Sequence, residues 1–185
     1  MKVIIKKNYN PEVPNEFAAS TTHGKVCKAP PKYWFACEHS PIRMFRYVIQ
    51  LLDVKTFVSV HLVRHGKFAE HAVMSKRDDL RPDKDEKVDR NTPVNHMIET
   101  NAQELINISK KRLCYKSSKE TVAVWKKVCN QVKEVEPELY PYLVPECVYH
   151  AGICPEYTEC SVGLDNVMKA YDDYPMLPKN RRKSA

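Results

Sequence analysis

The stretch from Asn101 to Glu120, NAQELINISKKRLCYKSSKE, constrains the fold of this chain most, because its pattern predicts a helix with a polar row along one side. At 100° per residue, Arg112 returns to within about 20° of the direction of Asn101, about three turns and roughly 16 Å along the axis. Two amides and a guanidinium among apolar neighbours suit an extended, anionic ligand such as a nucleotide beside a cofactor. A solvated helix face is the competing interpretation, and spacing alone favours it.

The beginning of the chain predicts strands. Residues 1–5 are typical of an opening strand, and a connection rich in proline and polar residues follows up to Pro31. Residues 44–51 place large apolar side chains at every second position and therefore predict a second strand. The face expected to be buried carries Phe45, Tyr47, Ile49 and Leu51.

Three helices are predicted from caps and stripes. Asp53 is placed to cap a helix whose apolar stripe ends at His65, although the β-branched residues there also suit a strand. Thr92-Pro93 predicts the start of a long helix running to about Cys114. Ser117-Ser118-Lys119-Glu120 predicts a capping box for a third helix, which Glu136-Pro137 ends. The apolar stripe of that third helix is Val122, Trp125, Cys129, Val132 and Val135.

The remaining segments carry weaker signals. Residues 73–77 are expected to return to the sheet, and residues 78–91 are expected to form a charged loop. The chain after Pro137, rich in proline, tyrosine and cysteine, is expected to be irregular.

Composition suits a single cytoplasmic domain. The chain has 185 residues, the usual size of one domain, which we place at 1–174 with a basic and disordered tail at 175–185. Its seven cysteines contain no repeated CxxC pair, which favours reduced thiols over a disulfide framework. No apolar run approaches the ~20 residues that span a bilayer, so no membrane partner is expected. The net charge of +7 favours an anionic ligand, but there is no recognisable nucleic-acid-binding motif and no direct nucleic-acid role is expected.

Three motifs follow one another along residues 37–156. The first is Ser40-Pro41 followed by the alternating strand. The second is Leu62-Val63-Arg64-His65 followed by Ser75-Lys76-Arg77. The third is the pattern N-x5-N-x4-R-x7-E from Asn101 to Glu120, with the cysteine- and proline-rich segment after it. Together these motifs resemble the flavin-dependent thymidylate synthases, and the second resembles the signature of that family. Their order and spacing make the resemblance more specific than any single motif.

The resemblance implies a fold and an activity. The fold would be an α/β (α+β) single domain with a central mixed or antiparallel sheet and flanking helices. The protein would form a homotetramer with shared active sites and bind FAD. It would convert dUMP to dTMP with methylenetetrahydrofolate and NADPH as co-substrates.

The resemblance also implies roles for individual residues. Arg112 would be the catalytic residue, lying against the uracil and stabilising negative charge that grows on the pyrimidine oxygens. Ser75 and Arg77 would bind the substrate together with Arg112. The cofactor-binding residues would be Arg64, His65, Asn101 and Asn107.

Several positions depart from the pattern of that family. Gly66 replaces an arginine, His61 stands where a glutamine is expected, and Gln103 stands where an arginine is common. Arg43-Met44 and Ser117-Ser118 also differ, and Ser75-Lys76-Arg77 lies one residue farther on than usual. Two alternatives therefore stay open: a dUMP or dCMP hydroxymethylase-like enzyme, and a non-catalytic nucleotide-binding protein. The compact length and divergence would suit a phage-encoded copy acting in the host cytoplasm.

The cysteines raise the question of a metal. Zinc could be bound by sulfur and imidazole ligands at Cys147, His150, Cys154 and Cys160. This spacing matches no recognised zinc finger, so no metal site is expected. Cys114 and Cys129 lie on helical stripes and are interpreted as core thiols.

Overall fold

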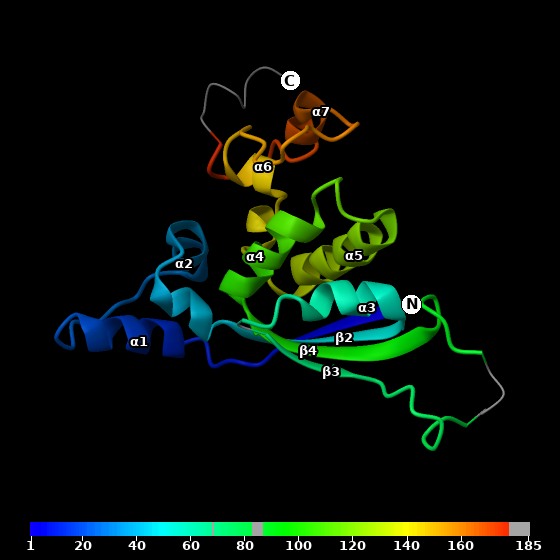
Figure 1. The fold of residues 1–185 in the computed structure, drawn as a ribbon. Coiled ribbons are helices and arrows are strands. Elements are labelled where there is room, and N and C mark those ends of the chain that lie inside the picture. The colour runs from blue at the N-terminus through cyan, green and yellow to red at the C-terminus, as the bar shows by residue number, and fades with distance from the viewer. Residues whose placement is uncertain (68, 83–86, 178–185) are drawn as a thin grey trace.

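A four-stranded antiparallel sheet forms the base of the molecule, in the strand order β1-β2-β4-β3 (Figure 1). The computed structural model describes residues 1–67, 69–82 and 87–177. The strands are β1 (Lys2–Lys7), β2 (Arg46–Lys55), β3 (Glu70–Val73) and β4 (Pro93–Asn101). The helices α3 (Thr56–Val63), α4 (Ala102–Arg112) and α5 (Lys119–Val135) lie over one face of this sheet (Figure 1). The predicted class, helices flanking an antiparallel sheet, is confirmed.

The central strand β2 follows the predicted alternation. The side chains of Tyr47, Ile49 and Leu51 are fully buried under the helices. Asp53 follows them with a positive φ of 60°, where the pairing with β4 shifts register. The predicted cap at Asp53 is therefore wrong, because the strand continues through a bulge to Lys55 before the helix begins. Thr56 then starts α3, and its hydroxyl donates to the carbonyl oxygen of Thr92 at 2.7 Å.

Strand β4 is the main correction to the sequence prediction. The segment that Thr92-Pro93 was expected to start as a helix is a strand as far as Asn101. Its burial alternates with a period of two, because Val94, His96, Ile98 and Thr100 are all nearly inaccessible. Proline is tolerated as the first residue of a strand, so the same residue that can open a helix opens β4 instead. Pairing with both β2 and β3 decides between the two.

Helix α4 consequently begins nine residues later than predicted, at Ala102. Asn101 is its N-cap, and the side-chain oxygen of Asn101 accepts from the backbone N–H of Glu104 at 3.0 Å. The sequence pattern had placed Asn101 and Arg112 in one row along a helix. Asn101 is instead the N-cap with extended backbone, so it does not belong to such a row.

Helix α5 matches its predicted stripe, with Trp125 and Val132 fully buried. Its cap is Ser118, whose hydroxyl oxygen accepts from the backbone N–H of Thr121 at 3.2 Å. The predicted capping box is thus shifted by one residue, and Thr121 takes the place expected for Glu120. The helix ends at Val135 before Glu136-Pro137, as predicted.

Short helices occupy two regions that were expected to be irregular. The first region contains α1 (Val13–Thr21) and α2 (Pro31–Cys37), beside the sheet (Figure 1). The second contains α6 (Glu146–Tyr149) and α7 (Leu164–Lys169), above α4 and α5. Proline stands at or immediately before the start of α2 and α6, where its fixed φ suits a first turn.

Two further predictions concern segments near the limits of the described chain. The predicted tail at 175–185 lies mostly outside the described residues, and within it Leu177 is buried. Residues 83–86 of the predicted charged loop also lie outside them, while the described part of that loop forms turns. In the described part of the chain, no helix has both the length and the apolar character needed to cross a membrane.

Candidate functional site

Arg112, at the last turn of α4, joins α4 to the end of α3. Its Nε donates to Nε2 of His65 at 2.8 Å, and its Nη2 donates to the backbone oxygen of His61 at 2.6 Å. The side chain is partly buried, and burial together with the charge of Arg64 lowers the pKa of Arg112. A guanidinium remains charged after such a shift, so this site holds a fixed cation.

The bond from Arg112 determines the protonation of His65. An arginine Nε–H can only donate, so Nε2 of His65 must accept and the ring must be neutral, with its proton on Nδ1. Burial, and next the charge of Arg112, lowers the pKa of His65 to about 4. His65 is therefore an acceptor near neutral pH. His61 is held similarly, because burial and the charge of Arg112 lower its pKa and its Nδ1 lies 2.9 Å from Thr121 Oγ1.

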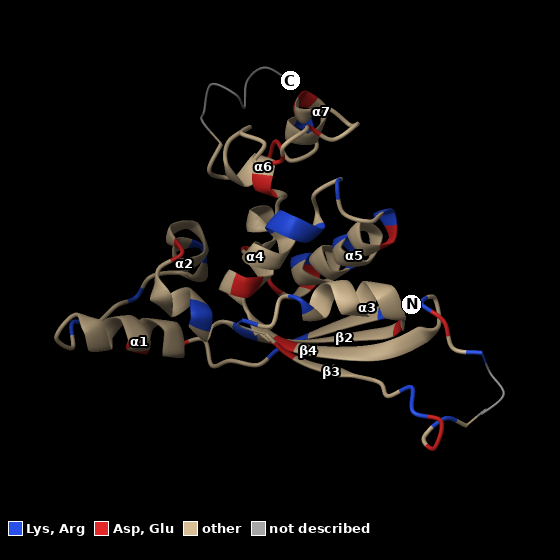
Figure 2. Cartoon of the chain, in the orientation of Figure 1, with Lys and Arg blue, Asp and Glu red and all other residues tan. Residues whose placement is uncertain are grey.

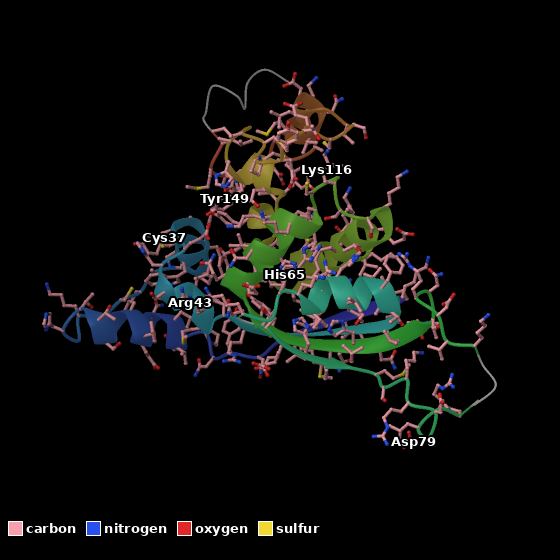
Figure 3. All side chains as sticks on the ribbon, in the orientation of Figure 1. Cys37, Arg43, His65, Asp79, Lys116 and Tyr149 are labelled. Atoms are coloured by element: carbon pink, nitrogen blue, oxygen red, sulfur yellow. The ribbon has the colours of Figure 1, made fainter. Side chains whose placement is uncertain are left out.

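These residues line an open hollow of about 460 Å³ at the ends of α3 and α4. Four cations line it together with the carboxylate of Glu156: Arg64, Lys111, Arg112 and Lys116. Figure 2 shows the concentration of lysine and arginine on the last turn of α4 and the loop that follows it. Fixed guanidinium donors and ammonium groups around one hollow suit an anionic ligand, above all one that carries phosphate. Figure 3 shows His65 where α3 and α4 approach each other.

The two predicted cofactor-binding asparagines lie elsewhere on α4. Asn101 caps the opposite end of the helix, and Nδ2 of Asn107 donates to Oε2 of Glu104 at 3.2 Å. Glu104 is itself buried, which raises its pKa. Of the predicted cofactor set, the described chain brings Arg64 and His65 to the hollow, and the asparagines are not among its lining residues.

The predicted substrate residues Ser75 and Arg77 lie in the loop after β3. The hydroxyl of Ser75 accepts from the backbone N–H of Arg77 at 3.2 Å, and Arg77 pairs with Asp79 at 2.6 Å. Both members of that ion pair are largely exposed. Figure 3 shows Asp79 at the far end of the molecule from His65. Within the described residues of one chain, Ser75 and Arg77 are therefore not assembled with Arg112.

Sequence reasoning missed a buried chain of polar side chains beside the site. Ser59 of α3 lies 3.0 Å from Nδ1 of His96, and Nε2 of His96 lies 2.9 Å from Nδ1 of His71. Burial and the proximity of His71 lower the pKa of His96 to about 4. The alternation of residues 93–101 is typical of a strand with His96 on its buried face. The Thr92-Pro93 signal for a helix start competes with it.

Comparison with known proteins gives a partial sequence match. No family model matches the chain. It is 33% identical over 78 residues to the flavin-dependent thymidylate synthase of Saccharolobus solfataricus, a stretch that covers 42% of this chain and 30% of that protein. It is 37% identical over 57 residues to the enzyme of the same name from Sulfurisphaera tokodaii, covering 31% of this chain and 22% of that protein. The chain thus matches less than a third of the length of each of these relatives.

Comparison of structures covers more of the chain. The structure of thymidylate synthase X (ThyX) from Helicobacter pylori with FAD and dUMP has a TM-score of 0.59 at 13% identity, covering 76% of this chain and 97% of that one. The UMP/dUMP methylase PolB from Streptomyces cacaoi, bound with 5-Br dUMP, has a TM-score of 0.56 at 11% identity, covering 76% and 94%. The fold is therefore a ThyX-like α/β fold. Over part of its length, the chain is also similar in sequence to the flavin-dependent thymidylate synthases.

Proposed function

We propose that this protein is a flavin-dependent thymidylate synthase that methylates dUMP to dTMP. The observation that carries the proposal is the Arg112 guanidinium, held by His65 and His61 at a cationic hollow within a ThyX-like fold. The partial sequence match to enzymes of that name supports it. The similar structure from Helicobacter pylori holds FAD and dUMP, which supports the same cofactor and substrate here.

Arg112 is the residue we assign to catalysis. Two of its five N–H donors are engaged by His65 and His61, which leaves others for a ligand. Donors fixed in place before the reaction stabilise charge that develops on a uracil oxygen without reorganising. Because the His65 imidazole and the His61 backbone carbonyl are neutral acceptors, they orient the guanidinium without cancelling its charge.

The donor set at the hollow fits a phosphate-bearing cofactor. Arg64 and Lys116 line the hollow with His65, and Lys116, whose Nζ donates to Thr158 Oγ1 at 2.7 Å, has two further N–H donors for the diphosphate of FAD. Asn101 uses only its carbonyl oxygen for the cap of α4, so its NH₂ group can still donate to a ligand. We therefore keep Arg64, His65, Asn101 and Asn107 as the proposed cofactor residues. FAD, when bound, supplies the redox chemistry, with NADPH as electron donor and methylenetetrahydrofolate as carbon donor.

We further propose that the protein acts as a homotetramer with shared sites. Ser75 and Arg77 lie in a loop away from the hollow of their own chain, so they can bind substrate with Arg112 only across subunits. The hydrogen bond between Arg112 and His65 joins these two residues within one chain. Arg112 therefore does not need Arg64 and His65 from another subunit. The segment we expect another subunit to supply to the Arg112 hollow is the loop from Ser75 to Arg77.

Subunit mixing tests this arrangement. Arg112→Ala and Arg77→Ala proteins should each be inactive, and exchange of their subunits should restore partial activity. A mixture of Arg112→Ala with Arg64→Ala is the matched control, because both changes fall on one hollow and intact sites should not re-form. A monomer in solution, or no recovery after proven exchange, would contradict the shared site.

The reaction itself is tested with purified protein. The protein should be yellow with flavin absorption and should form dTMP from dUMP, methylenetetrahydrofolate and NADPH, detected by mass spectrometry. Arg112→Ala should abolish turnover while the fold persists, and Arg112→Lys should also lose most activity because an ammonium lacks the planar fork. A colourless protein that binds dUMP would favour a non-catalytic nucleotide-binding protein. A hydroxymethylated product would favour the hydroxymethylase alternative.

The similarity to PolB supports a second candidate, a UMP/dUMP methylase. Parallel assays with UMP and dUMP separate the two. Comparable turnover of both would favour the methylase, whereas selectivity for dUMP would favour the synthase. The location we propose is the cytoplasm, where the free cysteines of the described chain would stay reduced.

A further inference from the structure

A second open pocket, of about 500 Å³, lies between α1, α2 and the start of the 3₁₀ helix η1 (Ser40–Met44). Its size is within the range of about 300–1,000 Å³ that is typical of small-molecule sites. Figure 1 shows α1 and α2 together at the left of the molecule. Within the described residues, this pocket shares no lining residue with the cationic hollow around Arg112. It is therefore a separate site.

The walls of the pocket are held in place by contacts within the chain. The indole of Trp34 in α2 is buried, and its Nε1 donates to Oδ1 of Asn15 in α1 at 3.3 Å. Helix α1 also packs against η1, where the lining residue Pro41 is buried. The pocket thus has its shape in the structure as it stands, and a ligand needs no rearrangement of side chains to enter it.

Two aromatic rings of the lining are open to solvent. Phe17 in α1 is 39% exposed and Tyr33 in α2 is 47% exposed. Tyr33 meets Trp34 edge to face, with ring centroids 4.9 Å apart. Such a contact uses at most one face of the Tyr33 ring, so another face remains for a ligand. Exposed rings beside a pocket favour a flat aromatic ligand, because stacking on them stabilises the complex.

Hydrogen-bonding groups line the same pocket. The imidazole of His39 and the hydroxyl of Ser40 make no hydrogen bond with the described part of the chain. The hydroxyls of Thr21 and Thr22 donate to backbone carbonyls three residues earlier, at 2.9 and 3.2 Å, so their oxygens can still accept. Donors and acceptors are therefore both available, as the edge of a nucleobase or a similar heterocycle requires.

The charge of the lining narrows the class of ligand. Among the described residues that line the pocket, none is a lysine, arginine, aspartate or glutamate. A phosphate or carboxylate would find no fixed cation here, and an aliphatic ligand would leave the polar groups without partners. We propose that this pocket binds an uncharged, planar heteroaromatic ring with polar edges, such as a nucleobase. The proposal does not depend on the reaction assigned to the Arg112 hollow.

Binding of adenosine and nicotinamide to the full chain tests the proposal. Both compounds are uncharged and heteroaromatic, and ribose is the non-aromatic control. Saturation-transfer NMR should show transfer from the protein to the ring protons of at least one of the two compounds and none to ribose. The same compound should change the fluorescence of Trp34, which lines the pocket. Trp34→Phe should abolish that change, because the other tryptophan, Trp125, is buried under α4 and α5 contacts.

Substitutions in the lining locate the bound ring. Phe17→Ala and Tyr33→Ala should each weaken binding by about tenfold, because each removes one stacking surface. Tyr157→Ala is the matched control, since Tyr157 is fully exposed and lies outside the pocket. It should bind the compound as wild type does. Arg112→Ala should also bind it normally, which separates this pocket from the cationic hollow.

Three results would overturn the proposal. One is the absence of saturation transfer to both adenosine and nicotinamide at millimolar concentration. Another is an equal loss of binding in Tyr157→Ala. The third is a loss in Arg112→Ala alone, which would place the ring in the hollow. If Phe17→Ala and Tyr33→Ala fail to fold, the wild type decides, because binding without any change in Trp34 fluorescence would exclude this pocket.

Discussion

Removal of the Arg112 guanidinium should raise the pKa of His65. Burial is the largest cause of the low pKa of His65, and the charge of Arg112 is the next. The 2.8 Å hydrogen bond acts in the same direction, because protonating Nε2 would set two N–H groups against each other. Arg112→Met keeps the apolar volume of the side chain and removes both the charge and the donor.

The size of the pKa change follows from the charged hydrogen bond that Arg112→Met removes. A hydrogen bond to a charged group contributes about 1.5–3 kcal/mol, and one pKa unit corresponds to about 1.4 kcal/mol. The pKa of His65 should therefore rise from about 4 by roughly one to two units. It should stay below the ordinary value of 6.5, because burial, the larger cause, remains.

Histidine ring protons followed by NMR across the acid range measure this pKa directly, and His65→Gln identifies the signal. Arg64→Met is the matched control, since Arg64 lines the same hollow but is not among the charges that lower the pKa of His65 in the described residues. An unchanged pKa in Arg112→Met would refute the coupling. An equal rise in Arg64→Met would show that the general field of the hollow, rather than the Arg112 bond, controls His65.

Three further predictions concern stability and ligand binding. Asn101→Ala should destabilise the protein by about 1 kcal/mol through loss of the α4 cap, and Asn101→Asp should not, as measured by urea unfolding. His96 has a folded pKa of about 4 against 6.5 unfolded, so the stability present above 6.5 should fall by roughly 3 kcal/mol as the pH drops towards 4. His96→Gln should flatten that dependence, and an equally steep acid loss would count against it. Arg64→Ala and His65→Ala should lower flavin content more than dUMP affinity. Ser75→Ala and Arg77→Ala should lower dUMP affinity more than flavin content. Equal losses of both ligands in all four variants would contradict the proposed division into cofactor-binding and substrate-binding residues.

Two elements were predictable because local and tertiary signals agree in them. In β2, the buried residues Tyr47, Ile49 and Leu51 stand at every second position, and this face packs against the helices. In α5, the 3.6-residue stripe through Trp125 and Val132 is long enough to outweigh any single residue. The helix predicted for residues 93–101 was wrong because a strong local start signal, Thr92-Pro93, competes there with pairing to strands far away in the sequence.

The candidate site was predictable only where one short motif carries it. Arg64 and His65 are neighbours in sequence, and Arg112 belongs to one helical pattern, so each could be singled out. The chain from Ser59 through His96 to His71 joins three separate elements, and only the sheet register brings it together. In the proposed shared site, Ser75 and Arg77 reach Arg112 across subunits, an arrangement that a single sequence pattern does not specify.

The junction between β4 and α4 explains how the sheet controls the position of Arg112. The backbone N–H of Ala102 donates to the carbonyl oxygen of Phe45 at 2.9 Å, and Asn101 caps the helix at the same point. The start of α4, and hence its rotation about its own axis, is therefore fixed by the sheet. Each inserted residue would turn the helix by about 100°, which would move Arg112 away from both His65 and His61. Strand β4, which the sequence signals failed to predict, is thus the element that orients Arg112, the proposed catalytic residue.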